Sequence, residues 1–285
     1  MFSLAIFLVI MSGLLHAVWN LLAKRSFTHV VFLWSFQWVA VVVYLPWALV
    51  AIGRHPITMR GWMLCALTAA VHGTYVLLLA NAYSLGDLSQ VYPLMRGVSP
   101  ILVPVLGVAL LGERLSAPGW LGVSAVIAGI GMLGEWRRPL ASSNPKPMSQ
   151  ATWLALGVGL SIAAYTTLDK VTLHYVPAVA LNDGSNLGNL ITLSWWAIRS
   201  RVIKIEWAAH WKTIIIGGII SPGGYLLFLT ALRMAPAARL APIREIGTVF
   251  ATVLGIVVLK EAQGRRRMAA SGIIAIGVIL LATWG

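Results

Sequence analysis

The chain has 285 residues, of which 59% are hydrophobic and 10% are charged, and its mean hydropathy is +0.85. A soluble domain carries about 25% charged residues, so this composition excludes an ordinary soluble protein and indicates an integral membrane protein. The formal net charge of +13 does not indicate a nucleic-acid partner, because the basic residues are scattered beside apolar stretches, where they act as determinants of membrane topology.

Ten apolar stretches follow one another, each close to the roughly 20 residues that a helix needs to cross about 30 Å of hydrocarbon. The first begins at Phe2 without a preceding basic segment, so we interpret it as a membrane span and not as a signal peptide. Residues 135–150 are polar and proline-rich, a composition typical of a linker. We therefore predict an all-α integral membrane protein with five-helix domains at 1–134 and 151–285. The predicted spans are 2–23, 30–52, 61–83, 89–111, 119–134, 151–168, 179–198, 213–234, 238–259 and 268–284.

The two halves of the chain repeat each other. Pro93 aligns with Pro242, and Trp19 aligns with Tyr165. The aligned segments are 16–24 with 162–170 and 75–113 with 225–261. Because five spans per half is an odd number, the second half enters the membrane in the opposite sense, which makes the chain an inverted repeat. This arrangement is typical of alternating-access carriers, and it places the functional site where the halves meet.

These motifs resemble the ten-helix EamA-type branch of the drug/metabolite transporter (DMT) superfamily. The resemblance covers essentially the whole chain and rests on HAVWNLLAK at 16–24, VYPLMRGVSPILVPVLGVALLGERL at 91–115 and LAPIREIGTVFATVLGIVVLKE at 240–261. It implies a multi-pass transporter of the inner or plasma membrane that exports amino acids, other small metabolites, nucleosides or drugs. It also implies a central cavity between the halves, with the fifth and tenth spans at the periphery.

Two arginines are candidates for substrate binding. A charge at the bilayer centre costs at least about 2.5 to 3.5 kcal/mol on insertion scales, yet Arg96 and Arg244 lie at matching depths of the fourth and ninth spans. A guanidinium offers a bidentate fork to carboxylate or phosphate, which predicts a small polar or anionic substrate such as an amino acid. The alternative is that both arginines only hold helices together. Other candidates, which can equally serve packing, join an apolar body to a polar tip: Trp19, Asn20, Tyr75, Asn81 and Tyr225.

Glu245 is interpreted as the one acidic residue deep inside a span, because Asp183 lies near the start of the seventh. Burial favours the neutral form of a carboxyl group, whereas a nearby arginine favours the ionised form. Glu245 is therefore either the carrier of the coupling proton or a fixed counter-ion. Neighbouring helix positions point about 100° apart, so we expect its partner to be Arg96 and not the adjacent Arg244.

His16 and His72 are further coupling candidates, because an imidazole titrates near neutral pH. Each can relay a proton or remain neutral and bonded to a backbone carbonyl. The polar run 182–189 in the seventh span is expected to face protein or water. Pro242 is expected to kink the ninth span. We expect one cavity lined by the first, third, fourth, sixth, eighth and ninth spans, with the linker at its rim.

Other functional classes find less support in the sequence. The chain has no HExxH, GxSxG or GxxxxGK motif, so we expect neither an enzyme nor an ATP-driven pump, and no cofactor or metal. The expected partners are a small-molecule substrate and the lipid bilayer, for a monomer or homodimer. A proton-coupled secondary transporter is the main hypothesis, and a passive facilitator or channel is the alternative. The positive-inside rule puts the face opposite the termini in the cytoplasm, whereas relatives are drawn with both termini inside, so the orientation stays open.

Overall fold

The computed structural model describes residues 2–23, 29–85, 88–133, 150–259 and 265–285. Within these ranges the regular secondary structure is helical, which confirms the predicted all-α fold. The predicted linker lies outside the described residues except for Gln150. The helices are α1 (Phe2–Ala23), α2 (His29–Arg54), α3 (Met59–Leu85), α4 (Leu88–Leu111), α5 (Ala117–Leu133), α6 (Gln150–Thr172), α7 (Ala178–Arg199), α8 (Ile203–Met234), α9 (Ala237–Ile243), α10 (Ile246–Leu259) and α11 (Arg265–Trp284).

The ninth predicted span is broken into α9 and α10. Arg244 and Glu245 form a turn between the two helices. Proline lacks the N–H that continues a helix, and after Pro242 the backbone tightens: the amides of Glu245 and Gly247 bond to carbonyls three residues earlier. The expected kink is therefore a complete break, and it leaves the two charged side chains at the discontinuity.

Two other helices are longer than their apolar stretches. α6 continues past residue 168 to Thr172, and α8 begins at Ile203, well before residue 213, with a kink at His210. The sequence analysis placed these charged ends in loops. The structure buries them, with Asp169 0% and Glu206 1% exposed. Glu245 is therefore not the one buried acidic side chain, although Asp169 and Glu206 lie near the ends of their helices.

Seven of the described helices are long and apolar enough to cross a membrane. They include Phe2–Trp19, Val30–Arg54, Met59–Ala82, Leu94–Leu111, Gln150–Thr172, Ile203–Met234 and Arg265–Trp284. The other predicted spans do not reach this length and hydropathy, and the structure shows why. α5 has 17 residues, α7 carries the polar run, and α9 and α10 divide one span between them. The run at 182–189 is expected to avoid lipid, and its Asn182, Asp183 and Asn186 are buried.

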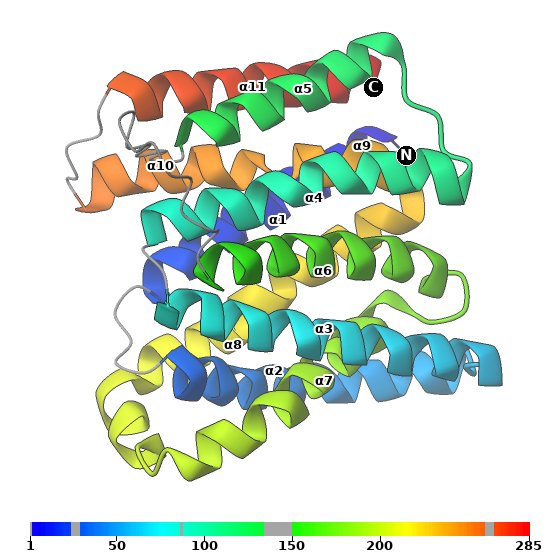
Figure 1. Cartoon of the computed structure of the whole chain (residues 1–285). Helices are drawn as coiled ribbons and strands as arrows, with labels where there is room; N and C mark the ends of the chain where they lie inside the picture. The colour runs from blue at the N-terminus through cyan, green and yellow to red at the C-terminus, as the bar shows by residue number, and fades with distance from the viewer. Residues whose placement is uncertain (1, 24–28, 86–87, 134–149, 260–264) are drawn as a thin grey trace.

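The first helix of each half packs into the other half (Figure 1). α1 lies against α8 and α10, and α6 lies against α3 and α4. Glycines allow these close approaches: a Cβ on Gly13 would stand 3.0 Å from the Gly247 nitrogen, and one on Gly159 would stand 2.5 Å from Val98. This exchange makes the space between the repeats a shared interior.

α5 and α11 pack against each other at one edge of the bundle, while α2 and α7 pair at the opposite edge (Figure 1). Gly122 and Gly277 bring the two edge helices into backbone contact, since a Cβ on either would lie within 2.8 Å of the other's carbonyl oxygen. The peripheral position expected for the fifth and tenth spans is confirmed.

Candidate functional site

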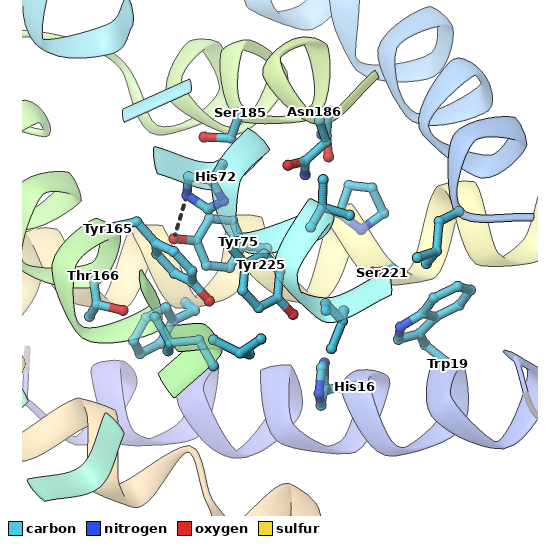
Figure 2. A pocket seen from close by; sticks show the side chains of 18 of the residues that line it. His16, Trp19, His72, Tyr75, Tyr165, Thr166, Ser185, Asn186, Ser221 and Tyr225 are labelled. Atoms are coloured by element: carbon cyan, nitrogen blue, oxygen red, sulfur yellow. Dashed lines mark hydrogen bonds between the residues drawn. The ribbon is translucent and has the colours of Figure 1, made fainter. Parts of the chain in front are cut away.

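A cavity of about 180 Å³ lies between the two halves. Side chains from α1, α2, α3, α4, α6, α7 and α8 line it, together with α9 and the break that follows α9. Figure 2 shows His16 and Trp19 of α1 on one side and Ser185 and Asn186 of α7 on the other. The six spans expected from the sequence all contribute. α2 and α7 were missed because their cavity residues, such as Gln37 and Asn189, have no basic or acidic group that stands out in the sequence.

Arg96 and Glu245 form an ion pair across the cavity, from α4 of the first half to the α9–α10 break of the second. Arg96 Nη1 lies 3.3 Å from Glu245 Oε1, and the two side chains are 13% and 4% exposed. The Thr248 hydroxyl lies 3.4 Å from the other carboxylate oxygen. The expected pairing of Glu245 with Arg96 is confirmed. The duplication has thus brought two equivalent helix positions into direct electrostatic contact.

Arg244 lines the same cavity but is held differently. Its guanidinium carbon lies 4.4 Å from the centre of the Phe228 ring and 5.2 Å from that of Tyr225. Among the described residues no ion pair joins it to a carboxylate, and its buried Nε atom has no hydrogen-bond partner. A guanidinium that is stacked and lacks a carboxylate partner can accept an anionic group from a ligand.

A second polar cluster lies where α3, α6 and α8 meet. His72 Nε2 lies 3.3 Å from Asp169 Oδ2, and the Tyr225 hydroxyl donates to the same oxygen. Tyr165 stacks on the His72 ring, with 4.0 Å between centroids and 23° between planes, and Tyr75 meets Tyr165 edge-on. In Figure 2, His72, Tyr165 and Tyr225 stand together, and a dashed line joins His72 to the Tyr225 hydroxyl.

Asp169 is the site residue that the sequence analysis missed. The predicted sixth span ended at residue 168, which left Asp169 in the following loop. Its counterpart in the first half is Ala23, so the duplication gave no signal. Helical spacing could have indicated that Asp169 belongs to the site. Tyr165 and Asp169 are four residues apart and therefore share one face of α6.

The other predicted site residues divide between the cavity and its outside. His16, Trp19, Tyr75 and Tyr225 line the cavity. Asn81 does not: its side chain is exposed and donates to the Leu77 carbonyl of its own helix. Nine residues separate it from His72, which at about 100° per residue turns it to the opposite face of α3. The side chain of Asn20 lies outside the described part of the chain.

Comparison with known proteins covers nearly the whole chain. The model of the EamA-like transporter family matches residues 3–134 and 150–283. A Sinorhizobium protein described as "Uncharacterized transporter in cobO 3'region" is 39% identical over 70 residues, which are 25% of this chain and 49% of that protein. The chain thus aligns with about half the length of this curated relative. A solved crystal structure superimposes with a TM-score of 0.72 over 98% of this chain and 95% of its own, and at 17% identity it shows the fold alone.

Proposed function

Because the chain belongs to the EamA-like transporter family, we propose that it is a secondary active transporter that exports a small polar or anionic metabolite by alternating access. The observation that carries the proposal is the pair of arginines, Arg96 and Arg244, in one cavity at the meeting of the two repeats. We place the protein in the cell membrane, as a multi-pass protein.

The charges of the cavity support a zwitterion such as an amino acid as the substrate. Arg244 has no carboxylate partner among the described residues, so it is the first group that a substrate carboxylate meets. Arg96 becomes available when the substrate displaces Glu245 from it. The substrate's ammonium group then faces Tyr75 and Tyr165, whose ring faces attract cations.

The size of the cavity supports a small substrate. Pockets for drug-sized ligands have volumes of about 300 to 1,000 Å³, and this cavity has about 180 Å³. Trp19 lines the cavity together with two phenylalanines: its ring centroid lies 4.5 Å from that of Phe36 and 5.6 Å from that of Phe32. An amino acid or a metabolite of similar size therefore fits the site better than a nucleoside or a large drug.

Proton coupling is the energy source that we propose. His72 and His16 both line the cavity, and an imidazole can bind a proton at one nitrogen and release one from the other. The contact between Arg96 and Glu245 supports the counter-ion role for Glu245. In that role Glu245 keeps Arg96 neutralised while the site is empty and yields it to the substrate carboxylate.

The test of the function compares amino acids inside and outside cells with and without overexpression of the chain. Wild type is expected to raise the extracellular level of one or a few of them. Arg96→Lys keeps the charge but loses the fork, so removal of about 1.5 kcal/mol of charge-assisted hydrogen bonding should raise KM roughly tenfold. Arg199→Lys is the matched control, because Arg199 stacks on the exposed Trp195 away from the cavity.

Unchanged kinetics in Arg96→Lys at equal expression would remove Arg96 from the substrate site. Collapse of the pH gradient by a protonophore separates the two transport modes. A coupled exporter loses accumulation against the gradient, whereas a passive facilitator continues to equilibrate the substrate at the same rate.

A further inference from the structure

We propose that Asp169 and His72 together form the proton-binding site of the exporter, and that Tyr225 connects this site to the substrate arginines. The proposal rests on the proposed export function and adds to it a specific carboxylate. It assigns the exchange of proton for substrate to the junction of α3, α6 and α8, and not to the Arg96–Glu245 pair.

The first argument is the charge balance of Asp169. Its carboxylate is fully buried, and a buried charge is costly unless a counter-charge or hydrogen bonds compensate it. No lysine or arginine forms an ion pair with it among the described residues. The contacting group that can supply a positive charge is His72, and it does so only by taking up a proton.

The second argument is the hydrogen bonding of the two carboxylate oxygens. His72 and Tyr225 both converge on Oδ2. Oδ1 is buried and has no hydrogen-bond partner in the described part of the chain. An unsatisfied buried acceptor is costly, and a proton on the carboxyl group relieves that cost. The site is therefore arranged to exist in a protonated and a deprotonated form.

The third argument is access. His72 and Tyr225 line the cavity, whereas Asp169 does not line it and contacts both of them. A proton can pass through the imidazole ring by binding one nitrogen and leaving the other. An ammonium group or a hydrated metal ion is too large for that route, so the geometry selects a proton.

Other titratable groups near the pair do not replace His72 as the proton partner. Tyr165 of α6 stacks on His72. Cys65 of α3 interacts electrostatically with Asp169 and with Asp183, which belongs to α7. These groups are neutral or negative at neutral pH. On the other side of Tyr225 lies Arg244, whose guanidinium stacks on the tyrosine ring and interacts electrostatically with it.

The sign of the coupling follows from these positions. Loss of the proton from the pair leaves a negative charge beside the cavity, which attracts the ammonium group of a zwitterion; gain of the proton removes that attraction. Proton and substrate therefore compete, as exchange requires. Protonation of Glu245 acts in the opposite direction, because it frees Arg96 for the substrate carboxylate. Proton-driven export thus needs Asp169 and His72.

The proton balance of the cycle is simple. Hydronium on the outer side gives a proton to the pair, so that one O–H bond of hydronium breaks as one N–H or O–H bond forms in the pair. That bond breaks when substrate binds from the cytoplasm, and the proton returns to water on the inner side. No oxidant, reductant or further reactant takes part.

The first experiment needs no substrate. Purified full-length protein in weak buffer is shifted from alkaline to mildly acid pH, and a pH-indicator dye reports the protons taken up. Wild type should take up one proton more than either Asp169→Asn or His72→Gln. Asn81→Ala, a change outside the cavity on the opposite face of α3, should match wild type. Uptake by both pair variants equal to wild type, or an equal loss of the proton in Asn81→Ala, would overturn the proposal.

The second experiment measures transport in proteoliposomes with a mixture of labelled amino acids. Asp169→Asn should keep exchange of labelled for unlabelled amino acid while accumulation driven by a pH gradient falls to the level of protein-free liposomes. If Asp169→Asn does not fold, His72→Gln decides by the same criterion. Full gradient-driven accumulation by the folded variant would overturn the proposal. Absence of any exchange by wild type would instead reject the proposed substrate class, and the dye measurement would still judge the proton site.

Discussion

Two arginines at matching depths of the two repeats have different environments. Arg96 is neutralised by Glu245 from the other half, while Arg244 lies on the Phe228 ring with no carboxylate partner in the described residues. The difference arises because only the second repeat carries a glutamate after its arginine; Gly97 follows Arg96. The duplicated helices thus supply one arginine held by a counter-ion and one that is open to a ligand.

The residue-scale prediction concerns Glu245→Gln. Removal of the charge leaves Arg96 in a low-dielectric interior without its partner, and breaking a buried ion pair costs about 3 to 5 kcal/mol. We expect a lower melting temperature in detergent, and partial recovery in the double variant Arg96→Gln with Glu245→Gln, since the two effects are coupled.

The same variant separates the two roles considered for Glu245. The folded fraction of Glu245→Gln should keep gradient-driven accumulation of labelled amino acids, because Glu245 is proposed as a counter-ion. A stable variant that exchanges amino acids but no longer accumulates them would make Glu245 the proton carrier.

Sequence reasoning identified the residues that the duplication or a charge made visible. Arg96 and its pairing with Glu245 follow from the aligned helices and from helical geometry. Asp169 did not follow, because its burial depends on His72 and Tyr225, which come from other helices far away in sequence. Asn81 was wrongly assigned to the cavity because polarity alone does not say which face of α3 it occupies.

The break between α9 and α10 is the element that shapes the site. It ends one helix at Ile243 and begins the next at Ile246, so both charged residues leave the regular helix between them. α1 supports the break through a backbone contact: a Cβ on Gly247 would lie 2.9 Å from the Gly13 carbonyl oxygen. The position of the break therefore depends on the absence of side chains at Gly13 and Gly247.

Gly247→Ala should displace α1 from the break, because the added methyl group meets backbone atoms that cannot rotate away. We expect overpacking to destabilise the protein by about 1 to 3 kcal/mol and to lower the transport rate of the folded protein. Gly131→Ala on α5 is the matched control, since a Cβ there meets nothing within 4 Å. Equal melting temperatures and equal transport of the two variants would show that the close contact between Gly13 and Gly247 affects neither stability nor transport.

α9 is stabilised at its start by a carboxylate from the first half. Glu113 accepts hydrogen bonds from the Ala237 and Ala238 amides at 2.8 and 2.7 Å. Negative charge at a helix N-terminus is favourable because the amides there lack partners in the helix. The two hydrogen bonds to Glu113, which follows α4, therefore hold the start of α9 in place.

Glu113→Gln should weaken this capping by about 1 kcal/mol and speed hydrogen exchange at the Ala237 and Ala238 amides. The measurement is exchange mass spectrometry on peptides from α9, with peptides from α11 as the internal reference. Unchanged exchange in α9 would indicate that these amides are protected without the carboxylate.

At the scale of elements the sequence predicted the helices well and their ends less well. Apolar runs of membrane length locate the helices, but α6 and α8 continue where the run stops. Lys170, at the end of α6, donates to the Leu232 and Ala235 carbonyls at the end of α8. Contacts of this kind, which no local pattern reveals, let charged residues remain helical.

The whole molecule consists of two repeats that share one interior. α1 and α6 each lie among helices of the opposite half, so a shift of one half relative to the other changes the cavity from both sides (Figure 1). The inverted repeat was predictable from the alignment of the halves. The packing of α1 and α6 was not, because it depends on glycine contacts such as Gly159 with Val98 rather than on hydropathy.

The most direct test of the account is uptake of a labelled amino acid mixture into inverted membrane vesicles under an imposed pH gradient, acid inside. Wild type is expected to accumulate one or a few of the amino acids above the external concentration, and a protonophore is expected to return them to equilibrium. Asp169→Asn should equilibrate the same amino acids without accumulating them. Uptake by wild type that never exceeds the external concentration, or accumulation that persists after the gradient is collapsed, would contradict proton-coupled export.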